Sequence, residues 1–187
     1  MTAQMPDSFF YKGEEFVLIG LKGSSLFKPN EFGIFPIMAS TACYRGFVAS
    51  YILTEKQLIL TGLMLRSQEE KLTEINDRAA INWKSPMGFN FMYRDLNLPI
   101  KFTGFILLGK DFIDEMYVHM GFQRPISFET VIEFQFKDGE IVTINDFSEL
   151  IAKLRNEDPS KGARPDYDES TMEWIDRLFS LDYNLPW

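Results

Sequence analysis

The chain has a single cysteine, Cys43, and a single histidine, His119. Together they could act as nucleophile and base of a hydrolase, because an imidazole beside a thiol lowers the thiol pKa and supplies thiolate near neutral pH. Cys43 precedes one expected strand and His119 follows another, so the fold can bring them together. Free cysteines are among the most buried residues, and a lone histidine is more often structural. We therefore favour structural roles for both and keep a Cys/His hydrolase as an alternative function.

Few residues are candidates for metal binding or acid-base catalysis. One cysteine and one histidine cannot supply a zinc cluster or a disulfide framework. Neighbouring acids such as Glu14 and Glu15 point to opposite faces of a strand and cannot share a substrate proton. Asp166, Asp168 and Glu169 lack the glycine and the closing glutamate of a helix-loop-helix calcium site. We expect no catalytic residue, no metal and no cofactor.

The basic residues do not indicate a nucleic-acid or nucleotide site. With 19 Lys and Arg against 27 Asp and Glu, the formal net charge is −8, which disfavours a surface that follows phosphates. The sequence has no Gly-x-Gly-x-x-Gly or Gly-Lys-Ser/Thr phosphate loop. Arg45 could hold a partner carboxylate, but an internal ion pair or stacking on an aromatic ring is the favoured interpretation. Trp83 is a candidate anchor for a protein partner.

Acidity is concentrated at the C-terminal end of the chain. Residues 156–187 hold eight acids and three bases, a net charge of −5, whereas residues 1–155 hold 19 acids and 16 bases, a net charge of −3. Such a surface attracts a basic partner by electrostatic complementarity. The expected partner-binding residues are Arg45, Trp83, Asp166, Asp168, Glu169 and Glu173.

Most of the elements that must position these residues are predicted to be strands. Expected hairpins cover residues 8–19, 45–65, 102–118 and 131–144, the third with its turn at Gly109-Lys110 and the fourth with an Asp138-Gly139 turn. We expect a mainly β, α+β fold: an antiparallel, partly closed barrel or sandwich of about eight strands, with one helix after the last hairpin and a C-terminal helix.

The last hairpin also allows a register to be predicted. With a two-residue loop at Asp138-Gly139, Phe136 faces Ile141 and Phe134 faces Thr143. The 18 phenylalanines of the chain either fill the core, which is favoured, or line a cavity for an apolar ligand, as in small barrels. A small-molecule-binding barrel is therefore a second alternative function.

We expect a single β-rich domain over residues 1–155 that ends in a helix over 147–155. An acidic connector then covers 156–169, and a C-terminal helix over 170–187 docks on the body. Ser170 and Glu173 form the capping signature of that helix. A short helix is also predicted over 68–78, and residues 82–99 are predicted to form a long loop.

The chain has neither an apolar run long enough to span a membrane nor the features of a signal peptide at its start, so we expect a cytoplasmic protein without a membrane span. The segments Thr41–Tyr51 and Tyr117–Phe122 resemble small β-rich bacterial proteins of unassigned function, over residues 9 to about 145. In acidity and in its lack of a catalytic signature, the chain is similar in character to bacterial immunity proteins. The sequence thus favours a non-catalytic interaction protein with a basic protein partner.

Overall fold

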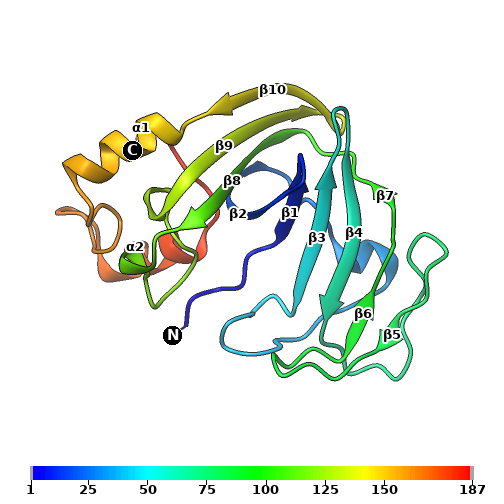
Figure 1. Ribbon diagram of the computed structural model, residues 1–187. Helices are drawn as coiled ribbons and strands as arrows, with labels where there is room; N and C mark the ends of the chain where they lie inside the picture. Colours follow the sequence, from blue (N-terminus) through cyan, green and yellow to red (C-terminus); the bar gives the residue numbers. More distant parts are fainter. Residues whose placement is uncertain (1, 186–187) are drawn as a thin grey trace.

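A computed structural model, which describes residues 2–185, contains one mixed sheet of ten strands with two α-helices packed at one side (Figure 1). From edge to edge the strands run β10-β9-β8-β2-β1-β3-β4-β6-β5, and β7 pairs with β4. Neighbouring strands are antiparallel except for β1 and β3, which run parallel. The strands are β1 (Ser8–Tyr11), β2 (Glu14–Gly23), β3 (Phe47–Leu53), β4 (Leu58–Leu65), β5 (Ile81–Asn82), β6 (Phe91–Tyr93), β7 (Leu98–Pro99), β8 (Gly104–Phe112), β9 (Phe128–Lys137) and β10 (Glu140–Asp146).

The expected β-rich α+β fold is confirmed, but the sheet is not closed. A single isolated bridge between Gln57 and Glu140 brings the turn before β4 to the start of β10, and no ladder continues from it within residues 2–185. A barrel needs a continuous ladder between its first and last strands. The prediction of a partly closed barrel is therefore wrong. All ten strands belong to one sheet, so the structure does not contain two separate sheets among residues 2–185.

Three of the four expected hairpins are present, namely β1–β2, β3–β4 and β9–β10. Asp138 and Gly139 both have positive φ, 52° and 87°, as a type I′ turn between β9 and β10 requires. The remaining expected hairpin, over residues 102–118 with its turn at Gly109-Lys110, is wrong because β8 runs straight through these residues and pairs with β2 and β9. A glycine stands there because the Phe128 ring packs on the strand, 2.7 Å from where a Cβ would lie.

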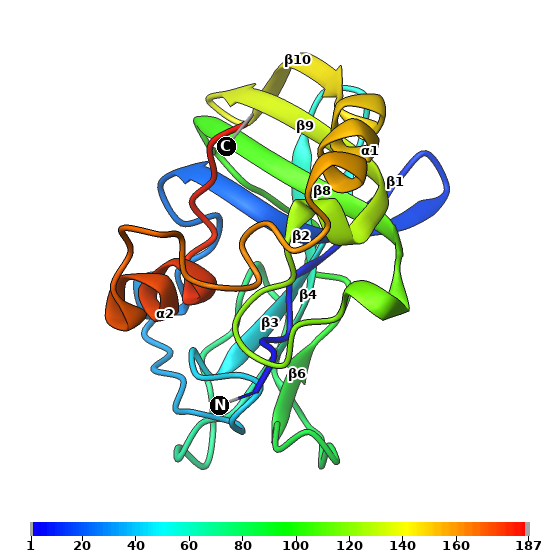
Figure 2. The same ribbon diagram turned by 90° about the vertical axis from the view of Figure 1, so that its left-hand side faces the viewer.

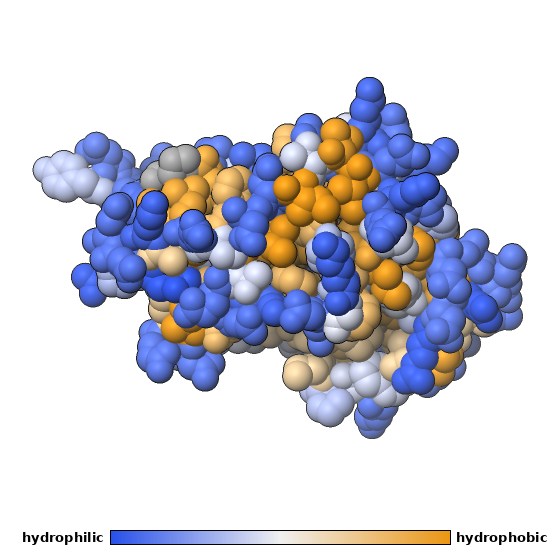
Figure 3. Space-filling view, turned by 45° about the horizontal axis from the view of Figure 1, so that its top comes forward, coloured by the Kyte–Doolittle hydropathy of each residue, from blue (hydrophilic) through white to orange (hydrophobic). Residues whose placement is uncertain are grey.

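The predicted register of the β9–β10 hairpin holds only next to the turn. Phe136 faces Ile141 as expected, but a β-bulge between Ile141 and Thr143 shifts the remaining pairs, so that Phe134 faces Ile144. A bulge adds one residue to one strand and turns the following side chains to the other face. The bulge places Ile144 opposite Phe134, and because β10 is an edge strand of the sheet, Ile144 is still 47% exposed. Apolar patches lie between hydrophilic residues on the upper face of the molecule (Figure 3).

Two other local predictions are corrected by the backbone. The expected helix over 68–78 is absent: Asn76 and Asp77 have positive φ, 47° and 59°, and form a tight turn inside the bridge between Ile75 and Arg78. The expected loop over 82–99 contains β6 and β7 and the end of β5. These short strands raise the strand number above the expected eight.

Both faces of the sheet are covered. Phe9, Tyr51 and Phe134 belong to the main core on one face, to which the loops between the strands also contribute. On the other face of β2, β8 and β9, a second core contains Leu107 together with residues of the first helix and the C-terminal tail (Figure 2). Successive residues of β8 alternate between the two cores, which confirms the expectation that this stretch is a central strand.

The helices are α1 (Ser148–Glu157) and α2 (Thr171–Phe179). The predicted capping box of α2 is confirmed, because Ser170 Oγ accepts from the Glu173 amide and the Glu173 carboxylate accepts from the Ser170 amide. The helix predicted to continue to residue 187 ends at Phe179. Within residues 2–185 no helix is long and apolar enough to cross a membrane.

Candidate functional site

The C-terminal tail, residues 180–185, packs on the face of the sheet that carries the second core, which we call the outer face. The amide of Leu21 in β2 donates to the Leu181 carbonyl at 2.7 Å. Tyr183 is buried and packs on Gly20, where a Cβ would lie 2.5 Å from the tyrosine ring. Its hydroxyl donates to Glu133 Oε1 at 2.6 Å, and burial together with this bond raises the pKa of Tyr183. The tail is therefore part of the second core.

Helix α2 docks against the loop that contains Gly121. The Phe122 amide donates to the Leu178 carbonyl at 2.8 Å, and Gly121 has a φ of 73°. A Cβ on Gly121 would lie 2.2 Å from the same Leu178 oxygen, so only glycine permits this approach. The Tyr44 and Phe179 rings are also in contact, with centroids 5.8 Å apart. Two separate segments thus fix α2 in place.

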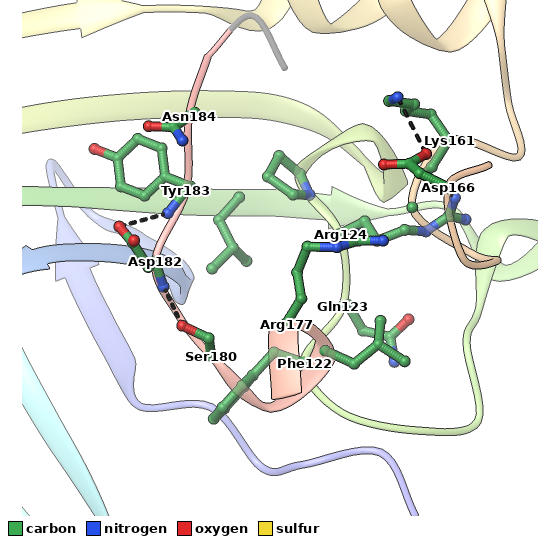
Figure 4. Close-up of a pocket in the computed structure, with 14 residues that line it drawn as sticks. Phe122, Gln123, Arg124, Lys161, Asp166, Arg177, Ser180, Asp182, Tyr183 and Asn184 are labelled. Carbon is green, nitrogen blue, oxygen red and sulfur yellow. Dashed lines mark hydrogen bonds and ion pairs between the residues drawn. The ribbon is translucent and has the colours of Figure 1, made fainter. Parts of the chain in front are cut away.

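A pocket of about 220 Å³ lies between this helix, the loop around Arg124 and the connector (Figure 4). Ile19, Leu178 and Tyr183 contribute apolar surface to it. At its charged end, the side chains of Arg124, Lys161 and Asp166 gather on one side of the pocket (Figure 4). The pocket therefore joins the connector, α2 and the body of the protein.

Arg124 holds the connector through carbonyl groups. Its Nη1 donates to the Lys161 carbonyl at 2.6 Å and to the Pro159 carbonyl at 3.3 Å, and its Nη2 donates to the Met116 carbonyl at 3.3 Å. Burial lowers the pKa of Arg124, and its Nε is buried without a hydrogen-bond partner among the described residues. Gly162 of the connector has a φ of 75°, a backbone conformation that favours glycine.

Two ion pairs complete the attachment of the connector. Arg177 of α2 donates to both carboxylate oxygens of Glu169, at 2.8 and 2.7 Å, and Lys161 Nζ lies 3.4 Å from Asp166 Oδ1. The bonds from Arg177 are the main cause that lowers the pKa of Glu169 to about 2. Bidentate pairs of this kind fix geometry as well as charge. The connector is therefore held in one conformation.

The four acids expected to bind a partner lie together but have different roles. Glu169 is bound to Arg177, Glu173 caps α2 and Asp166 faces Lys161. Asp168 is exposed and takes part in no hydrogen bond or ion pair among residues 2–185. The same holds for Glu157 and Asp176, the two other uncommitted acids of the segment. Most of the acidity that the sequence shows is thus used inside the segment.

Two exposed apolar residues of this segment could not be found from composition. Tyr167, between Asp166 and Asp168, is fully exposed, and Met172 on α2 is 67% exposed. Sequence reasoning also missed Arg124, because its partners lie 35 and 37 residues further along the chain. The only available signal for Tyr167 was its position between acids in a segment with few apolar residues.

The structure places the other two expected partner-binding residues away from this segment. Arg45 donates to both oxygens of the buried Asp7 carboxylate and stacks on the Phe47 ring, 4.6 Å from its centroid. This confirms the favoured interpretation of Arg45 as an internal ion pair and stacking residue. Trp83 is partly buried against Cys43 and other residues of a small core behind β3 and β4. It follows β5, on the opposite side of the molecule from α2 (Figure 1).

The thiol and the imidazole are not paired with each other. Cys43 is buried, its thiol donates to the Phe47 carbonyl at 3.4 Å, and burial raises its pKa. His119 is exposed and packs edge-on against Tyr117. A thiol with a raised pKa is less often present as the thiolate nucleophile. This arrangement gives no support to the hydrolase alternative.

A metal site needs several ligating side chains close together. Among residues 2–185, no group of three or more His, Cys, Asp or Glu side chains is arranged to hold a metal ion. Comparisons with protein-family models, with curated proteins and with solved structures found no match for this chain.

Proposed function

We propose that the protein is a non-catalytic interaction protein that binds a basic protein partner through its C-terminal segment, residues 157–176. The observation that carries the proposal is the fully exposed Tyr167 beside the uncommitted carboxylate of Asp168. Tyrosine is enriched at the energetic centres of protein interfaces, and a free carboxylate next to it selects a positively charged partner. This acidic, non-enzymatic character is that of immunity and inhibitor proteins.

Charge supports a basic partner. Residues 156–187 carry a net charge of −5, and the uncommitted acids Glu157, Asp168 and Asp176 are all exposed on this segment. Their field accelerates encounter with a basic surface and is screened by salt over about 10 Å at 0.1 M ionic strength. Binding should therefore weaken as salt is added.

The fixed conformation of the segment supports the same proposal. The Arg124 clamp, the Arg177–Glu169 pair and the capping box of α2 hold the backbone on both sides of Tyr167. A segment that is already ordered loses less conformational entropy when it binds. Met172, exposed on the first turn of α2, adds a polarizable apolar contact close to Tyr167 in the sequence.

Photo-crosslinking in cells of the source organism tests the proposal. A photoreactive benzoylphenylalanine at position 167 or 172 should capture the same basic protein. The same residue at Ile81, which is exposed on β5 across the molecule, should not capture it. The absence of a common adduct at 167 and 172, or a common adduct that is acidic, contradicts the proposal.

Binding of the captured partner then provides the quantitative test. D168N/D176N removes two uncommitted charges and should weaken binding about tenfold and reduce its salt dependence. E69Q/E70Q removes the same charge from an exposed loop elsewhere and should bind like the unaltered protein. Equal affinity of the two variants would show that the C-terminal acids do not attract the partner.

A further inference from the structure

A second pocket, of about 340 Å³, lies beside the residues that follow β4 and those that precede β6. Three segments far apart in the sequence form it: the segment with Ile37, the residues Arg66 to Gln68 after β4, and the turn from Lys84 to Asn90. The pocket belongs neither to the C-terminal segment nor to the Arg45 cluster. Its size falls within the range of roughly 300–1,000 Å³ that is usual for small-molecule sites.

The charged residues that line this pocket are both basic. Arg66 and Lys84 contribute to its wall, and no aspartate or glutamate does. Neither residue forms an ion pair among residues 2–185, and both are exposed. Arg66 Nη1 donates one hydrogen bond, to the Ala39 carbonyl at 3.3 Å. In a chain with a net charge of −8, two uncompensated cations at one pocket are an unusual local excess.

The pocket also contains two serine hydroxyls that are free to donate. Ser67 Oγ accepts from the Glu69 amide, and Ser85 Oγ accepts from the Met87 amide, each at 3.1 Å. Neither hydroxyl proton has an acceptor among the described residues. Since a hydroxyl can donate and accept at the same time, both can still bind an anionic oxygen.

Hydrogen bonds and a glycine fix the conformation of the loops that carry these donors. The Asn90 side chain accepts from the Ser67 amide at 2.9 Å and donates to the Ser67 carbonyl at 2.8 Å, which holds the buried Ser67 in place. Gly88 has a φ of 91°, and a Cβ there would lie 2.3 Å from the Ala39 carbonyl oxygen. This glycine lets the 84–90 turn close against the segment with Ile37.

Two acidic residues stand next to the pocket lining in the sequence. Glu69 and Glu70 follow Gln68 in the sequence, but neither lines the pocket. The charge of Glu69 acts on Tyr93, whose pKa is raised to about 12 by burial first and by Glu69 second. Within the lining, the only side chains that can offer an oxygen acceptor are neutral.

We propose that this pocket binds a phosphoryl group. A phosphate dianion presents several oxygens, which suits a guanidinium, an ammonium and two hydroxyls that line the same pocket. Phe89 and Ile37 supply an apolar side to the pocket, which leaves space for the organic part of a phosphate monoester. The phosphoryl group is the shared chemistry of two sources, the free phosphate ion and a small monoester.

Titration of the full chain with inorganic phosphate and with phenyl phosphate, followed by calorimetry, tests the proposal and separates the two sources. Saturable binding of either compound is expected, with tighter binding of phenyl phosphate if a monoester is the natural ligand. Phenol serves as the probe without a phosphoryl group and should not bind. Failure of both phosphates to bind, or binding of phenol with equal affinity, overturns the proposal.

Matched variants assign the binding to this pocket. R66Q/K84Q should reduce the affinity at least about tenfold, because two charge-assisted contacts are lost. K56Q/K101Q removes the same charge at two exposed lysines outside the pocket and should leave the affinity unchanged. D168N/D176N should also bind phosphate normally, so this test is independent of the proposed protein partner. Unchanged affinity in a folded R66Q/K84Q variant places the phosphate elsewhere and contradicts the assignment.

Discussion

Two regions of the molecule contain arginine and lysine beside a pocket, and they use these charges differently. In the C-terminal region, Arg124 is bound to backbone carbonyls, Arg177 to Glu169 and Lys161 to Asp166. In the loop pocket, Arg66 and Lys84 line the wall with no carboxylate partner among the described residues. Charges with internal partners stabilise the fold, whereas charges without them remain available to a ligand. The same residue types therefore have structural roles in one region and a recognition role in the other.

The largest expected effect is on the region whose charges are internally paired. Removing residues 159–187 leaves α1 whole but uncovers the outer face of β2 and β8, and it takes Leu178 and Tyr183 out of their buried positions. Full burial of such a side chain contributes about 1.5–3 kcal/mol, so the loss in the free energy of unfolding should be about 3–6 kcal/mol. Urea denaturation measures it, and an unchanged midpoint would show that the tail is not part of the core.

A glycine substitution tests how α2 is docked while the helix itself is kept in the chain. In Gly121→Ala the new Cβ meets the Leu178 carbonyl at 2.2 Å in a residue with positive φ, which should cost about 2–3 kcal/mol. Gly33→Ala is the matched control, because Gly33 has a similar φ of 69° and open space around its Cβ, and should cost about 1 kcal/mol. Equal losses in thermal unfolding would mean that α2 is not held by this contact.

The smallest expected effect depends on pH and concerns the connector. The pKa of Glu169 is about 2 in the folded protein, below its ordinary value of 4.5, so its contribution is complete above pH 4.5 and is lost as pH falls from 4.5 towards 2. The Trp174 indole, which donates to the Gly162 carbonyl at 3.5 Å, reports the change by NMR. E169Q should show the low-pH indole signal at neutral pH, and a signal in the unaltered protein that is constant down to pH 2 would contradict this role.

Local signals predicted much of this fold, and long-range packing accounts for what they missed. The Asp138-Gly139 turn and the Ser170 capping box could be predicted because their hydrogen bonds join residues a few positions apart. The prediction of a turn at Gly109 was wrong because the glycine is required by packing against the Phe128 ring, and Phe128 lies 19 residues away in the sequence. The prediction of a closed barrel was wrong because hydrophobic alternation shows which residues face the core. It does not show whether strands far apart in the sequence pair with each other.

The candidate sites show the same limit. The acidic segment was visible in composition, but Arg177 occupies Glu169 from 8 positions away, and Arg124 holds the backbone of the connector from 35 and 37 positions away. The loop pocket gave no sequence signal at all, because its polar residues are ordinary ones that come from two separate segments, Arg66 to Gln68 and Lys84 to Asn90. Its chemistry emerges only when the fold brings Arg66, Ser67 and Lys84 together.

One crossed measurement tests the contrast between paired and unpaired charges most directly. Arg124→Gln and R66Q/K84Q are each compared with the unaltered protein in urea unfolding and in phenyl phosphate titration. Arg124→Gln, which loses three hydrogen bonds from a charged donor, should lower the free energy of unfolding by about 2 kcal/mol and leave phosphate affinity unchanged. R66Q/K84Q should lower phosphate affinity and change the free energy of unfolding by less than about 0.5 kcal/mol. The opposite pattern, with stability lost in R66Q/K84Q and retained in Arg124→Gln, would contradict the division of roles between the two regions.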